Sequence, residues 1–138
     1  MSDGHKISEV TAGERRKRLI TIIESLPGAT ATPAGERHVS LEVRGKRFGW
    51  FLEDHHSDRR LALNLKAANG VSRALVAKAP ARFHVPKYTG HHGWLGVWLD
   101  FPDPDWKEIK KLLEDAYLLT APRRLATVLL STSENPKT

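Results

Sequence analysis

The chain of 138 residues contains no cysteine. Disulfide bonds, thiolate nucleophiles and cysteine-ligated zinc or iron–sulfur centres are therefore excluded. No apolar run approaches the roughly 18 residues that suggest a membrane-spanning helix, so we expect no membrane partner. The first 20 residues also lack the apolar segment of a secretory signal, which predicts a cytoplasmic protein.

Motifs that would carry catalysis are missing as well. The sequence has neither a glycine-rich phosphate loop ending in Lys and Ser or Thr nor an HExxH pattern. Two histidine pairs, His55-His56 and His91-His92, fall in expected loops beside a few carboxylates. Their spacing is not typical of a metal site, and exposed loop histidines are the favoured interpretation. The sequence therefore predicts a protein that is not an enzyme and that needs no cofactor or metal.

Acidic residues are absent from one long segment. Between Arg59 and Leu99 there are seven Lys or Arg residues and no Asp or Glu, whereas the whole chain has 22 basic and 16 acidic residues and a net charge of +6. A basic excess in the middle of the chain favours an acidic partner, and nucleic acid is the first candidate. A solvated basic surface without a partner is the alternative.

Hydrophobic periodicity predicts a single domain over residues 11–130, with flexible ends at 1–10 and 131–138. Helices are expected at 11–26, 70–78, 104–119 and 122–130, with Asp103 as the N-cap of the third. Alternating apolar residues predict strands near 39–43, 48–52, 61–65, 82–85 and 94–100, the first two joined by a tight turn. Residues 28–36 are expected to form a loop. The fold class is α+β, in two layers, with an antiparallel five-stranded sheet and helices on one face.

Strand alternation also predicts which side chains occupy the face of the sheet away from the helices. If Trp50 faces the helices, the outer face combines basic and aromatic residues, namely Arg47, Arg60, Lys66, Phe51, Trp94 and Trp98. Cations that neutralise phosphate beside flat rings that stack on bases suit nucleic-acid binding. The alternative is that the tryptophans are covered by a loop, the chain tail or a second copy.

Several ordered segments resemble the MmcQ/YjbR family. They are Leu26-Pro27-Gly28, Val43-Arg44-Gly45-Lys46-Arg47-Phe48, Leu61-Ala62-Leu63, Phe83-His84-Val85-Pro86-Lys87-Tyr88, Gly93-Trp94-Leu95-Gly96-Val97-Trp98-Leu99-Asp100 and Asp105-Trp106 through Ala121-Pro122-Arg123-Arg124-Leu125. The resemblance covers about residues 14–127. It implies a two-layer α+β fold like that of type III secretion chaperones, a DNA-binding role and no known catalytic residues.

Charge and resemblance together predict a small cytoplasmic protein that binds nucleic acid, with DNA as the expected partner. The expected binding residues are Arg44, Lys46 and Arg47 at the hairpin turn, Arg60, Lys66 and Lys87 as phosphate contacts, and Trp94 and Trp98 as stacking groups. The competing hypothesis is a protein-interaction or chaperone-like domain, including a homodimer, that uses the aromatic face of the sheet without catalysis.

Overall fold

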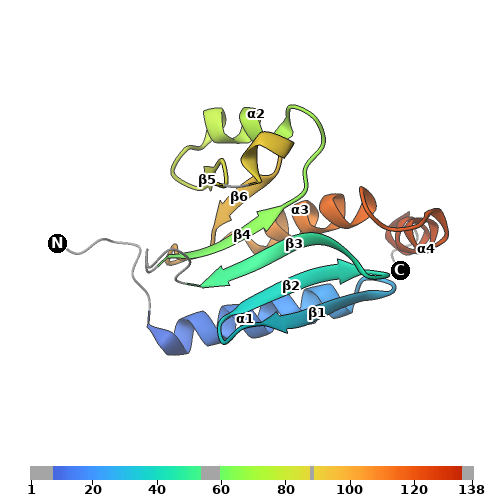
Figure 1. The fold of residues 1–138 in the computed structure, drawn as a ribbon, viewed down its shortest axis with the longest axis horizontal. Coiled ribbons are helices and arrows are strands. Elements are labelled where there is room, and N and C mark those ends of the chain that lie inside the picture. Colours follow the sequence, from blue (N-terminus) through green and yellow to red (C-terminus); the bar gives the residue numbers. More distant parts are fainter. Residues whose placement is uncertain (1–7, 54–59, 88, 135–138) are drawn as a thin grey trace.

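In the computed structural model, which describes residues 8–53, 60–87 and 89–134, four α-helices accompany a six-stranded antiparallel sheet (Figure 1). The strands lie in the order β1-β2-β3-β4-β6-β5. In chain order the elements are α1 (Glu9–Glu24), β1 (Ala29–Ala34), β2 (His38–Val43), β3 (Lys46–Glu53), β4 (Leu61–Leu65), α2 (Val71–Lys78), β5 (Phe83–His84), the 3₁₀ helix η2 (Gly90–His92), β6 (Leu95–Trp98), α3 (Trp106–Leu118) and α4 (Arg123–Glu134). The predicted α+β class is confirmed.

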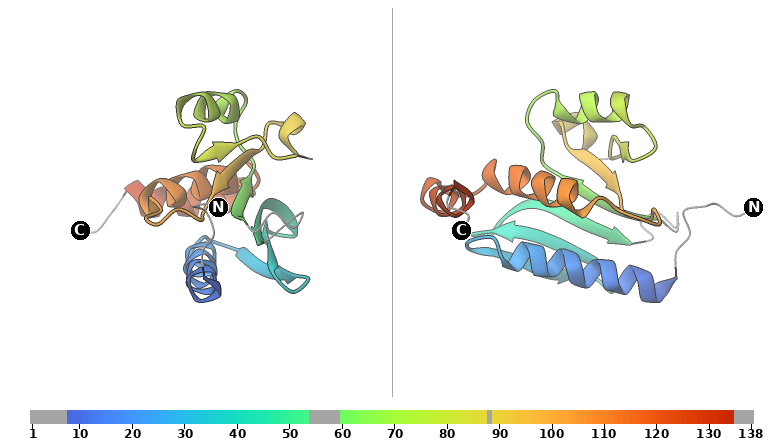
Figure 2. Two further views of the ribbon diagram at one scale, coloured as in Figure 1. Left: turned by 90° about the vertical axis from the view of Figure 1, so that its left-hand side faces the viewer. Right: turned by 180° about the vertical axis from the view of Figure 1, so that it is seen from behind.

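The long helices α1 and α3 lie on one side of the sheet (Figure 2). Leu19 and Ile23 of α1 and Leu113 and Tyr117 of α3 are completely buried. They pack against the strand residues of the same face, which are equally buried: Leu41, Phe51, Leu63 and Leu95 among others. Removing these apolar side chains from water stabilises the two layers at about 25 cal/mol per Å².

The expected loop at 28–36 is wrong in part, because residues 29–34 form the edge strand β1. This strand pairs with β2 from Ala29 opposite Val43 to Ala34 opposite His38. Its sequence, ATATPA, has no large apolar residue, so hydrophobic alternation could not reveal it. Pro33 is compatible with an edge because a strand there leaves one side unpaired. The sheet therefore has six strands where five were predicted.

A β-bulge in β3 reverses part of the predicted outer face. The pairing with β2 steps from Leu41 opposite Gly49 to Glu42 opposite Arg47, so that Phe48 is an extra residue. Phe48 and Phe51 are consequently both buried on the helical side. Trp50 points outward, in register with polar residues on both neighbouring strands. The prediction of Phe51 on the outer face and Trp50 on the inner face is wrong, because a bulge shifts the alternation by one residue.

The predicted tight hairpin is confirmed. Arg44 and Gly45 join β2 to β3 with positive φ angles of 51° and 79°, as a type I′ turn requires.

The predicted N-cap of α3 is wrong: the cap is Asp105, whose carboxylate accepts a hydrogen bond from the Glu108 amide at 3.1 Å. Asp105 and Glu108 have the spacing of a capping box, which Asp103 lacks.

The helices at both ends differ slightly from the expected ranges. α1 begins at Glu9, after the capping residue Ser8, and α4 continues to Glu134, beyond the predicted end at residue 130. The rest of the expected flexible ends, 1–7 and 135–138, lies outside the described residues. Within the described parts of the chain, no helix is both long and apolar enough to cross a membrane.

His38 is expected to make the fold sensitive to acid. Burial, and then the positive charges of Arg16 and Arg37, lower the pKa of its imidazole below the ordinary 6.5. Its Nδ1 accepts a hydrogen bond from the Glu53 amide at 3.2 Å, which also requires an unprotonated Nδ1. Because the His38 pKa is lower in the folded protein than in the unfolded chain, the unfolded chain binds the proton more readily. The free energy of unfolding should therefore fall as the pH drops below about 6.5.

Chemical denaturation at pH 7.5 and 5.5 measures this loss. The variant His38→Asn keeps an acceptor near the Nδ1 position but does not titrate, so it should lose less stability between the two pH values than the native protein. Equal losses would contradict the assignment to His38.

Candidate nucleic-acid interface

The β2–β3 turn presents three basic side chains to solvent. Arg44, Lys46 and Arg47 lie at or directly beside the two-residue turn, and all three are exposed. In Figure 1 this turn lies at the same end of the molecule as α4. The hairpin therefore concentrates positive charge at one end of the sheet.

Helix α4 adds two more cations at that end. A Cβ atom on Gly28 would lie 2.7 Å from Leu125 Cδ1 and 3.6 Å from Arg44 Nε, so both side chains contact this glycine. Arg123 and Arg124 immediately precede Leu125 in the first turn of α4, and both are exposed. We call the five residues Arg44, Lys46, Arg47, Arg123 and Arg124 the basic end. It joins two segments that are almost 80 positions apart in the sequence.

Tyr117 is the buried support of the basic end. Its hydroxyl donates a hydrogen bond to the Pro27 carbonyl, which holds the start of β1 against α3. Burial raises the pKa of the Tyr117 phenol, and the positive charge of Arg44 partly offsets that rise. The Tyr117–Pro27 contact thus anchors the segment on which Arg44 and Leu125 meet.

Arg47 is held in place along the outer face. Its guanidinium carbon lies 4.2 Å from the centre of the Trp50 ring, a cation–π distance. Its Nε donates to Ser40 Oγ at 2.8 Å, and Ser40 Oγ donates to Glu42 Oε2 at 2.7 Å. These contacts order the side chain without removing it from solvent.

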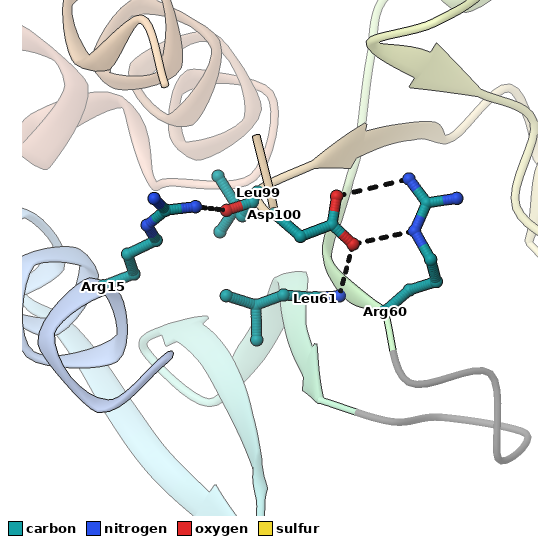
Figure 3. A network of polar contacts seen from close by, with 5 residues as sticks. All are labelled: Arg15, Arg60, Leu61, Leu99 and Asp100. Carbon is teal, nitrogen blue, oxygen red and sulfur yellow. Dashed lines mark hydrogen bonds and ion pairs between the residues drawn. The ribbon is translucent and has the colours of Figure 1, made fainter. Parts of the chain in front are cut away.

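Arg60, a predicted binding residue, belongs to a packed cluster around Asp100 (Figure 3). Arg60 forms two hydrogen bonds with Asp100, Nε to Oδ2 at 2.7 Å and Nη2 to Oδ1 at 3.2 Å. The Asp100 side chain is fully buried and also accepts from the Leu61 amide at 3.1 Å. Next to Asp100, directly after β6, the Leu99 carbonyl accepts a hydrogen bond from Arg15 of α1. The charge of Arg60 is therefore already balanced by a buried carboxylate.

Both faces of the Trp98 ring are occupied. The Arg60 guanidinium lies 3.6 Å from its centre, and the His84 ring stacks on it at 3.9 Å with an interplanar angle of 22°. Two groups this close to one ring must occupy opposite faces, since they would otherwise overlap. A nucleic-acid base could stack on Trp98 only by displacing one of them.

The remaining predicted residues do not gather at the basic end. Lys87 is exposed beyond β5, Lys66 is half-buried at a small apolar cavity beside Leu112 of α3, and Trp94 is half-buried before β6.

The acid-free segment from Arg59 to Leu99 does not form a surface without acidic residues. Besides Arg60, Arg82 forms an ion pair with Glu108 at 2.6 Å. Carboxylates from outside the segment thus neutralise part of its charge.

Arg123 and Arg124 are the members of the basic end that the sequence prediction missed as binding residues. Two adjacent arginines after Pro122 were visible as the start of a helix, but nothing local showed that this helix packs beside the hairpin.

Of the two histidine pairs, His91-His92 lies on η2 and His55-His56 lies outside the described residues. Within the described residues, no group of three or more potential metal ligands occurs.

Comparison with known proteins agrees with this architecture. A family model described as YjbR matches residues 24–119, more than half of the chain. A solved structure from Deinococcus radiodurans, assigned to the domain DUF419, superposes with a TM-score of 0.62 at 22% identity, covering 75% of this chain and 76% of that one. At this identity the likeness is evidence for the fold alone. A search of curated proteins gives no match.

Proposed function

The chain belongs to the YjbR family, and we propose that it binds nucleic acid, with DNA as the partner, through the basic end. The observation that carries the proposal is that Arg44 and Leu125 both contact Gly28, which brings the exposed hairpin cations to the end of the molecule where the first turn of α4 carries the exposed Arg123 and Arg124. Exposed cations that gather from separate segments suit a phosphate backbone, whose charges are closely and regularly spaced. The proposed activity is binding without catalysis, in the cytoplasm.

Electrostatics at the basic end favours phosphate contacts over base recognition. Arg44 and Lys46 are exposed at the β2–β3 turn, where their side chains can reach a phosphate backbone. The Trp98 ring, by contrast, already has a partner on each face. Contacts to phosphate position a protein on nucleic acid but carry little sequence information. We therefore expect weak sequence preference.

The outer face of the sheet gives less support to the protein-interaction alternative. Large exposed apolar patches mark docking surfaces, whereas here Arg47 lies over Trp50 and Arg60 over Trp98. A measurement of mass in solution distinguishes the two hypotheses: a monomer that binds DNA supports the basic end, and a dimer that does not bind DNA favours the alternative.

Neutralising the hairpin cations tests the proposal directly. In the double variant Arg44→Ala with Lys46→Ala, the affinity for a mixed-sequence DNA duplex should fall about tenfold at moderate salt. The slope of log K against log salt should become shallower by about 2, because roughly one counterion is released per phosphate contact. Fluorescence anisotropy of a labelled duplex over a salt series measures both quantities. The pair Arg123→Ala with Arg124→Ala should behave in the same way.

A matched control removes the same charge elsewhere. Lys107 and Lys110 are exposed on the first turns of α3, outside the basic end. Replacing both with alanine should change the affinity less than twofold. The proposal fails if this pair weakens binding as much as the hairpin pair does, or if native affinity is insensitive to salt.

A further inference from the structure

A polar cavity of about 500 Å³ lies between α2 and the segment that leads into β6. One wall is the start of α2 with Asn69, Ser72 and Arg73, and the other is the turn of η2 with His91 and His92. Figure 1 shows α2 and β5 at the side of the sheet opposite to β1, away from the basic end. The cavity therefore needs an explanation separate from the proposed DNA contacts.

The backbone at the start of α2 offers hydrogen-bond donors to this cavity. The first amides of a helix have no acceptor within the helix. Here the N-cap is Gly70, which has no side chain to accept from them, and among the described residues only the Val71 amide finds a nearby acceptor outside the helix, the Ala68 carbonyl at 3.0 Å. The next two amides, of Ser72 and Arg73, are left at the cavity wall. Their dipoles favour a negative charge in front of the helix.

Ser72 provides an independent sign that a polar ligand belongs in the cavity. Its residue is only 7% exposed, yet it lines the cavity. Within the described residues its hydroxyl makes no hydrogen bond with another side chain or the backbone. The hydroxyl oxygen is not one of the fully buried polar atoms that lack a partner, so it is reached from the cavity, where a ligand oxygen can bond to it.

The charge of the lining residues decides what kind of ligand fits. Arg73 contributes a guanidinium, and His91 and His92 contribute imidazole groups that contact each other with ring centres 3.8 Å apart. Among the described residues, no carboxylate lines the cavity. Backbone amides, a hydroxyl and a guanidinium together match the oxygens of a phosphate group.

We propose that this cavity binds a phosphomonoester, with the phosphate at the Ser72 and Arg73 amides and the organic group beside His91 and His92. The volume is within the range of small-molecule sites and accommodates a group the size of a nucleoside. The ligand is either a free phosphorylated small molecule or the terminal phosphate of a nucleic-acid strand, since both present the same chemistry. The proposal does not depend on DNA binding by the basic end.

Titration calorimetry of the full chain with 5′-AMP and with adenosine tests the proposal. Binding of 5′-AMP but not of adenosine is expected, and the same comparison with a 5′-phosphorylated and an unphosphorylated trinucleotide distinguishes the two sources. A trinucleotide that binds only when phosphorylated, in the absence of 5′-AMP binding, assigns the site to a strand end. Equal binding with and without phosphate, or no binding of any of these compounds, overturns the proposal.

Variants locate the binding within the cavity. Ser72→Ala should weaken binding about tenfold, as expected for one lost hydrogen bond to a charged group, while its thermal midpoint without ligand stays the same or rises, because the hydroxyl has no protein partner. Arg73→Gln, at an exposed side chain, should weaken binding at least as much and provides a second test if the serine variant folds poorly. Lys78→Gln, in the last turn of the same helix, is the matched control and should bind normally.

The hairpin pair Arg44→Ala with Lys46→Ala separates the two proposals. These residues are outside the cavity, so 5′-AMP affinity should be unchanged even where DNA binding is lost. Loss of 5′-AMP binding in this pair, with normal binding in Ser72→Ala and Arg73→Gln, would place the phosphate at the basic end and contradict the cavity site.

Discussion

Asp100→Ala is expected to destabilise the protein by about 3–5 kcal/mol, the typical cost of breaking a buried ion pair from one side. The carboxylate is fully buried and accepts hydrogen bonds from the Arg60 guanidinium and the Leu61 amide. Removing it leaves a half-buried cation and a buried amide without their acceptor (Figure 3). Urea denaturation of the native and variant proteins measures the difference in free energy of unfolding.

Two companion variants separate the contributions. Asp100→Asn keeps an oxygen for the Leu61 amide but loses the charge, so it should cost less than Asp100→Ala. The double variant Arg60→Leu with Asp100→Leu removes both charges, and should also be less harmful than Asp100→Ala alone, because no uncompensated guanidinium remains. If the double variant is as unstable as the sum of its two single variants, the ion pair is not the source of the effect.

Gly49→Ala should destabilise the sheet by about 2–3 kcal/mol, at the upper end of the usual cost of overpacking a core. A Cβ atom there would lie 2.7 Å from Leu65 Cδ2, 3.0 Å from the Asn64 carbonyl oxygen and 3.1 Å from Leu41 Cδ1. Both leucines are fully buried and the third neighbour is backbone, so none can move away easily. Thermal and urea unfolding both report the loss.

Gly13→Ala is the matched control for this substitution. Gly13 lies within α1, is exposed, and has nothing within 4 Å of an added Cβ. The same methyl group should therefore stabilise the protein here by about 0.5–1 kcal/mol, because alanine favours the helix more than glycine does. A similar loss of stability at both positions would show that the close approach of β3 to β4 is not responsible.

The parts of the fold that the sequence predicted are those with strong local patterns. Leu61, Leu63 and Leu65 alternate cleanly and form β4, and the turn at Arg44 and Gly45 joins two such runs. β1 was not predicted because its alanines and threonines give no alternation, and it is a strand only because β2 offers it a partner. Phe51 was assigned to the wrong face because the bulge at Phe48 arises from pairing between strands, not from the sequence of one strand.

The candidate site was predictable to a smaller extent. The hairpin cations Arg44, Lys46 and Arg47 were predicted from the sequence and are exposed in the structure, whereas Arg123 and Arg124 join them only through the packing of Leu125 near Gly28. The acid-free segment was misleading because an ion pair depends on distance in space. Asp100 and Glu108 lie just outside the segment in sequence and contact Arg60 and Arg82 within it.

The sequence by itself determined the fold class, the family and the presence of a basic hairpin. The fold class and the hairpin depend on the periodicity of apolar residues and on turn residues, which act over a few neighbouring positions, and the family on the resemblance of several ordered segments. The tertiary structure alone decided which cations are available and which are neutralised, which tryptophan faces are covered, and that a polar cavity forms between α2 and η2. Charge, ring contacts and cavities act through space over a few ångströms, so residues that are distant in the sequence decide them.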